Sequence, residues 1–128
     1  MTTVVAAVIR RGKRILICRR SALAQSHALK WEFPGGKVEV GESPPQALCR
    51  ELREELAVSA RIGAELVRYE FTYPGKSPIL LIFYEVTGFD GEERNCVFEE
   101  IRWAVPAELP LFDFLEGDID FVKRLSSA

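Results

Sequence analysis

Residues 35–56, GGKVEVGESPPQALCRELREEL, join a double glycine to a helix start and a run of glutamates. Gly35 and Gly36 permit backbone angles closed to other residues, so they predict a tight, exposed turn. The SPPQ sequence at 43–46 is typical of a helix start, because serine caps the first amides and glutamine completes a capping box. The stretch therefore predicts a backbone turn followed by a helix that ends near Ala57.

Three glutamates of this helix, Glu51, Glu54 and Glu55, lie on one side, since residues three or four apart share a helical face. A solvated face would favour oppositely charged partners at four-residue spacing. Arg50 and Glu54 form the only such pair in the motif, in the less favourable order. Convergent carboxylates instead suit Mg²⁺, which takes oxygen ligands together with water and substrate phosphates. A neighbouring stripe is predicted to pack on the core and comprises Leu48, Leu52 and Leu56.

The turn in front of the helix adds features that suit a polyanion. Gly35-Gly36-Lys37 can present bare backbone groups and one cation, and Glu42 adds a carboxylate just before the helix. A phosphate-binding turn and a metal-binding helix together indicate chemistry on a diphosphate. A plain Mg²⁺ or Ca²⁺ binding protein would leave the Gly-Gly-Lys turn unexplained, and the chain lacks an EF-hand loop.

Length and composition favour one domain over residues 1–128 and exclude several partners. The net charge of -2, without a basic stripe, argues against polymeric nucleic acid. The apolar run 4–9 is too short to span a membrane, and basic residues follow it where a signal peptide needs them in front. Three cysteines without metal-ligand spacing fit a reducing compartment, so we expect a cytoplasmic protein.

Outside the motif, alternating apolar patterns predict a mixture of strands and helices. Strands are expected at Val4 to Ile9 and Ile15 to Cys18 as a pair, at 62–73 and Ile79 to Val86 around a turn at Tyr73 to Lys76, and at Val97 to Ala104. Residues 21–30 are expected to form a loop. The last helix is predicted from Asp113 to Leu125.

The spacing of Gly36, Glu42 and the segment Arg50 to Val58 closely resembles the Nudix box. Ala57 stands where the family pattern has glycine, which affects the end of the helix and leaves the carboxylates untouched. The wider context, with Arg19-Arg20 and the WEFPGGK sequence at 31–37, resembles the MutT-type branch of that family.

The resemblance implies an α+β fold, an α/β/α sandwich with a mixed sheet between helices. It also implies a Mg²⁺-dependent enzyme, with Mn²⁺ as a substitute, that hydrolyses a nucleoside triphosphate such as 8-oxo-dGTP to the monophosphate and pyrophosphate. A CTP or pyrimidine nucleotide pyrophosphohydrolase and another nucleoside diphosphate-X hydrolase remain alternatives. A non-catalytic nucleotide-binding module is an alternative of another class, whose usual signature is loss of the box glutamates. A monomer or a homodimer is expected.

Carried over by position, Glu54 and Glu55 are expected to be metal ligands, Glu51 a ligand or general base, and the Gly35 carbonyl a further ligand. Several members of the family draw another ligand from a glutamate in a loop before a late strand, which makes Glu99 a candidate here, with a plain surface residue as the alternative. Arg50 is expected to orient Glu51 or Glu54 by a charge-assisted hydrogen bond.

The predicted substrate contacts are less specific than the metal ligands. Lys37 or Arg20 is the candidate for binding phosphate. Phe33 is expected either to stack on a nucleobase or to pack in the core. Asp113 falls where MutT-like relatives place a residue that recognises oxidised guanine, and its alternative role is a helix cap.

Overall fold

β1 (Thr2–Arg11) is the central strand of a seven-stranded mixed sheet in the computed structural model, which describes residues 1–127. It pairs in parallel with β6 (Ile79–Asp90) and antiparallel with β4 (Gly35–Lys37). Beyond β6, β5 (Ser59–Phe71) forms an edge of the sheet. The mixed parallel and antiparallel pairing confirms the predicted sheet type.

β2 (Arg14–Arg19) begins a second part of the sheet that turns away from β1. It pairs with the end of β1 only through Arg10 and Arg11 and then with β3 (Trp31–Glu32) and β7 (Glu100–Ala104). The predicted pairing of the first two strands is confirmed. The chain between β2 and β3 forms the predicted loop.

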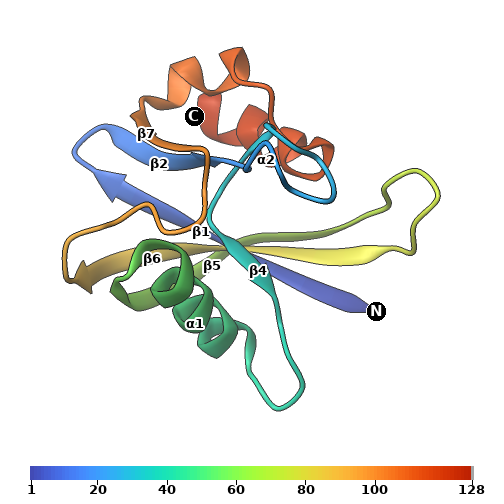
Figure 1. Cartoon of the computed structure of the whole chain (residues 1–128), viewed down its shortest axis with the longest axis horizontal. Helices are drawn as coiled ribbons and strands as arrows, with labels where there is room; N and C mark the ends of the chain where they lie inside the picture. Colours follow the sequence, from blue (N-terminus) through green and yellow to red (C-terminus); the bar gives the residue numbers. More distant parts are fainter. Residues whose placement is uncertain (128) are drawn as a thin grey trace.

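Helices cover both faces of the sheet (Figure 1). α1 (Pro44–Leu56) packs on one face, and α2 (Glu116–Ser126) with the 3₁₀ helix η1 (Pro106–Leu111) packs on the other. Alternate residues of a strand point to opposite faces, so β1 serves both layers. Val5 faces the α1 layer and Ala6 faces the α2 layer. The predicted α/β/α sandwich is confirmed.

α1 has the start, length and buried face that the sequence predicts. The Ser43 hydroxyl accepts the Gln46 amide at 3.3 Å, and the Gln46 side chain accepts the Ser43 amide at 2.9 Å. Ala57 follows the helix in the left-handed conformation, with φ 60° and ψ 34°. The helical stripe that packs on the sheet is fully buried and consists of Leu48, Leu52 and Leu56.

The predicted start of the last helix at Asp113 is wrong, because α2 begins at Glu116. The preceding residues lie alongside β3 instead. The Trp31 amide donates to the Asp113 carbonyl, and the Leu115 amide donates to the Trp31 carbonyl, each at 2.9 Å. Phe114 bridges to Trp31 in the same stretch, so pairing with a distant strand overrides local helix propensity. Asp113 is therefore not the helix cap.

Candidate active site

The double glycine of β4 holds two glutamates of α1 against the central strand. The Glu55 carboxylate accepts the Gly35 amide at 3.0 Å. The Glu51 carboxylate lies against Gly36, where a Cβ would stand 2.5 Å from its Cδ. A Cβ on Gly35 would overlap the carbonyl oxygen of Val5. Bare backbone at both positions is therefore what lets β1, β4 and the helix meet.

Arg50 binds the acidic groups on the outer side of this cluster. Its guanidinium donates to Glu42 at 2.7 Å and to Glu51 at 2.8 Å, and lies 3.4 Å from a Glu54 oxygen. It also donates to the Lys37 carbonyl at 3.0 Å. The prediction that Arg50 orients box glutamates therefore agrees with its contacts, which also hold β4 and the helix together.

The carboxylates of Glu55, Glu32 and Glu51 lie in buried surroundings that disfavour their ionised forms. Burial, followed by repulsion from Glu32 and Glu51, raises the pKa of Glu55 from 4.5 to about 9. Burial raises the pKa of Glu32 to about 7 against the opposing effect of Arg20, which lies 3.3 Å away. Burial also raises the pKa of Glu51, although Arg50 opposes the shift. An additional cation near these groups would relieve the cost of their ionisation.

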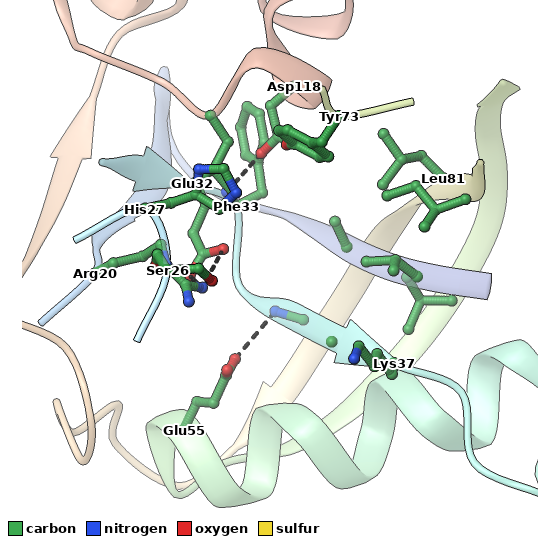
Figure 2. Close-up of a pocket in the computed structure, with 17 residues that line it drawn as sticks. Arg20, Ser26, His27, Glu32, Phe33, Lys37, Glu55, Tyr73, Leu81 and Asp118 are labelled. Atoms are coloured by element: carbon green, nitrogen blue, oxygen red, sulfur yellow. Dashed lines mark hydrogen bonds and ion pairs between the residues drawn. The ribbon is translucent and has the colours of Figure 1, made fainter. Parts of the chain in front are cut away.

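A cavity of about 290 Å³, called the central pocket here, opens beside the glycine turn. Figure 2 shows Glu55 from α1, Glu32 from β3 and Asp118 from α2 on its walls. Its size lies near the lower end of the range for ligand pockets, roughly 300–1,000 Å³. The residues that line it include Arg20, Ser26, His27, Glu32, Phe33, Gly35, Gly36, Lys37, Glu55, Tyr73 and Asp118.

Asp118 is the only buried charged residue among residues 1–127, and it is not among the residues predicted from the sequence. Its carboxylate has one long contact, 3.5 Å from the Phe33 amide. Burial, followed by repulsion from Glu32, raises its pKa from 3.8 to about 8. A signal was present in the sequence, because Asp118 shares a helical face with the apolar residues Phe121 and Val122.

Glu32 was also missed, although strand alternation could have pointed to it. Trp31 and Phe33 on either side are buried in the layer under α2. A residue between them must point to the other face, which is the side of the box glutamates. Glu32 thus adds a carboxylate to the cluster from a separate strand.

Three of the four predicted substrate residues line the central pocket. The Lys37 side chain is exposed and takes part in no ion pair within residues 1–127. Arg20 faces the pocket while bound to Glu32 and to the Ser26 carbonyl. Phe33 is 3% exposed, and its ring stacks on Phe114 with centroids 5.3 Å apart. Phe33 is therefore packed in the core at the wall of the pocket, and its stacking on a nucleobase stays a prediction.

Two predicted residues are not among those that line the central pocket. Asp113 is exposed, pairs with Lys30 at 2.9 Å and lines a different cavity. The Glu99 carboxylate accepts the Ala22 amide at 3.0 Å and so holds the loop after β2. Within residues 1–127, neither side chain bonds to a box glutamate or lines the central pocket, and their proposed roles stay predictions.

The described residues 1–127 contain no group of three acidic, histidine or cysteine side chains placed to hold a metal ion as they stand. Arg50 binds Glu51 and Glu54 directly, which keeps these ligand candidates engaged. The donor set nevertheless suits a hard divalent cation, because it consists of carboxylate and carbonyl oxygens. A bound cation would also favour the ionised forms of Glu55, Glu51 and Glu32, whose pKa values are all raised without it.

The layered fold and the glycine-glutamate site together define a phosphate-processing enzyme class, and comparison with known proteins identifies the family. The NUDIX domain profile matches residues 1–125. The chain is 37% identical to the CTP pyrophosphohydrolase of Escherichia coli K12, over 96% of this chain and 90% of the relative. It is 39% identical to the 8-oxo-dGTP diphosphatase of the same organism, over 89% and 87%.

Solved structures agree with this assignment. The solution structure of the E. coli ORF135 protein has a TM-score of 0.87 and 36% identity, over 99% of this chain and 89% of that one. The MutT protein of Methanosarcina mazei Go1 has a TM-score of 0.85 at 25% identity, over 98% and 93%. The chain belongs to the Nudix family and is a hydrolase of phosphoric anhydride bonds. None of the helices within residues 1–127 has the length and apolar character needed to cross a membrane.

Proposed function

We propose that this chain is a Mg²⁺-dependent nucleoside triphosphate pyrophosphohydrolase that releases the monophosphate and pyrophosphate, with Mn²⁺ as a substitute. The observation that supports this most directly is the glycine turn, which holds Glu51 and Glu55 beside a pocket lined by Lys37 and Arg20. Carboxylates and cations adjoin each other there, as a metal-bound polyphosphate requires.

Glu51, Glu54, Glu55 and the Gly35 carbonyl would hold the cation. When bound, a divalent cation neutralises phosphate oxygens and lowers the pKa of a water ligand. Glu51 is the candidate base for the attacking water, because its carboxylate is half-buried against Gly36 and oriented by Arg50 at 2.8 Å. Lys37 and Arg20 would contact phosphate oxygens on the pocket side.

The buried end of the pocket would bind the nucleobase. Asp118 and Glu32 offer hydrogen-bond acceptors at neutral pH to the extent that they are ionised, and their raised pKa values make each able to donate when protonated. The oxidised base of 8-oxo-dGTP carries an N–H at its N7, whereas guanine has an acceptor there. An ionised carboxyl at this point would therefore favour the oxidised base over guanine, because only the ionised form lacks the proton that guanine N7 would accept.

CTP is a second candidate, favoured by the same two acidic groups and by the small cavity. Cytosine presents an exocyclic amine, which pairs with aspartate or glutamate in base recognition. A pocket of about 290 Å³ also suits a single-ring base. The residues within the pocket thus support both nucleotides.

The test is pyrophosphate release from 8-oxo-dGTP, dGTP, CTP and ADP-ribose in excess Mg²⁺, ranked by kcat/KM. Glu54→Gln should lose most turnover while keeping the fold, and Glu92→Gln in an exposed loop is the matched control. Undiminished release by Glu54→Gln would reject the metal assignment. A clear preference for ADP-ribose would reject the triphosphate assignment, and binding without turnover of any nucleotide would indicate a non-catalytic module.

A further inference from the structure

Two loops that are far apart in sequence meet at the mouth of the central pocket. His27 lies in the loop between β2 and β3, and Tyr73 lies in the hairpin between β5 and β6. Their ring centroids are 4.8 Å apart with an interplanar angle of 48°, and both rings line the pocket (Figure 2). This contact, the His27–Tyr73 clasp, therefore spans the mouth next to the proposed base site.

Tyr73 forms the fixed side of the clasp. Its hydroxyl accepts the Gly117 amide at 3.0 Å, and its ring packs edge-on against Phe71 with centroids 4.8 Å apart. A Cβ at residue 117 would stand 2.8 Å from the Tyr73 hydroxyl. Glycine at the start of α2 thus leaves room for the tyrosine and ties the hairpin to the helix that carries Asp118.

His27 forms the side that is held under backbone strain. Its φ is 55°, and Leu29 in the same loop has φ 65°, both in the left-handed region that L-residues disfavour. Such conformations persist where the surroundings impose them. Arg20 holds the Ser26 carbonyl at 3.2 Å, and the Lys30 amide donates to the His27 carbonyl at 3.2 Å.

Phe33, the most deeply buried aromatic residue of the pocket lining, is packed in the core. The face of Phe33 is taken by Phe114, as described above. The ring of His27 is exposed and that of Tyr73 is half-buried, so both aromatic rings keep contact with solvent where they line the pocket. Aromatic side chains bind nucleobases by stacking or edge contact, with little dependence on base identity.

We propose that His27 is a base-contacting residue that closes the mouth of the central pocket against Tyr73 and retains the nucleobase there. This inference rests on the proposed nucleotide hydrolysis. The clasp supplies the aromatic wall, while Asp118 and Glu32 supply the polar contacts. The wall is built from a loop and a hairpin, separately from the glutamates on α1.

Two substitutions at His27 distinguish the contribution of the aromatic ring from that of the backbone conformation. Asparagine tolerates the left-handed conformation but has no ring, so His27→Asn should keep its melting temperature. Its KM for 8-oxo-dGTP and CTP should rise roughly 5- to 30-fold, in the lower part of the range for base–aromatic stacking. His27→Phe keeps a ring but strains the backbone, so its melting temperature should fall while KM stays within about twofold of wild type.

The readouts are KM, kcat and inhibition by inorganic tripolyphosphate, which has the phosphates but no base. We expect kcat and the tripolyphosphate inhibition constant to be unchanged in both variants. An unchanged KM in His27→Asn would overturn the proposal, as would a parallel rise in the tripolyphosphate constant, which would indicate a disturbed phosphate site. Failure of the wild type to cleave any triphosphate would instead reject the proposed function.

Discussion

Ala57→Gly should stabilise the protein, because Ala57 ends α1 with φ 60° and ψ 34°. An L-residue pays roughly 1–2 kcal/mol for this conformation, and glycine does not. Glycine costs about 0.4–1 kcal/mol more entropy on folding. The alanine side chain is exposed, so its removal loses little burial. With the middle value of each range, the net gain is about 0.8 kcal/mol.

The hydrogen bonds at the end of the helix do not depend on the side chain of residue 57. The Ala57 amide donates to the Arg53 carbonyl at 3.1 Å, and the Arg94 amide donates to the Leu56 carbonyl at 2.8 Å. Both use backbone atoms that glycine retains. The substitution should leave kcat within about twofold, since the Glu55 carboxylate stays bound to Gly35.

Thermal and urea denaturation measure the effect, which corresponds to a rise in melting temperature of about 2–4 °C. Ala64→Gly is the matched control, because Ala64 is also exposed and has a negative φ. That control should lose stability, as glycine does in a strand interior. An unchanged or lower melting temperature for Ala57→Gly would show that the left-handed end of the helix is not a source of strain.

Other perturbations test the glycine turn, the arginine and the buried acid. Gly36→Ala places a Cβ 2.5 Å from Glu51 Cδ, so activity should fall at least about 100-fold while the fold survives by side-chain movement; Gly35→Ala, which meets backbone, should lower the melting temperature sharply. Arg50→Lys cannot keep the separate contacts of the guanidinium, so kcat should fall about 10-fold or more with a smaller change in KM. Asp118→Asn should stabilise the fold increasingly from pH 4 to 8. The native carboxyl has a raised pKa of about 8 and holds its proton over that window, whereas the unfolded chain releases it. The gain above pH 8 is at most about 6 kcal/mol, at about 1.4 kcal/mol for each pH unit between 3.8 and 8, and equal melting temperatures of the two proteins at pH 5 and pH 9 would contradict it.

Local signals predicted the elements that local interactions form. α1 needs only its capping residues, its proline and the apolar stripe, and its observed bounds Pro44–Leu56 match the prediction closely. The start of α2 was misplaced because Asp113 and Leu115 bond to the backbone of Trp31, more than 80 positions earlier. No local pattern reports such a partner.

The candidate site likewise has one part that local sequence signals predict and another that depends on residues distant in sequence. The box glutamates share one helix, so their side of the site follows from helical spacing. The pocket combines Glu32 with Asp118 from separate elements and closes with His27 against Tyr73. The spacing of residues along the sequence cannot show that residues of separate elements lie together in the fold. The sequence did mark both acids, through strand alternation at Glu32 and an acidic residue on the apolar face of α2.

The carboxylates that burial makes hardest to ionise stand where the sheet meets its helices. Asp118, Glu55 and Glu32 come from three elements, and burial is the first cause of the raised pKa in each. Apolar residues at these positions would avoid that cost, as they do in the rest of the core. Glu32 also raises the pKa of both Glu55 and Asp118, so one side chain links the glycine turn to the buried end of the pocket. A chain that retains three such groups in one cavity has the charge distribution of a binding site rather than of a packed core.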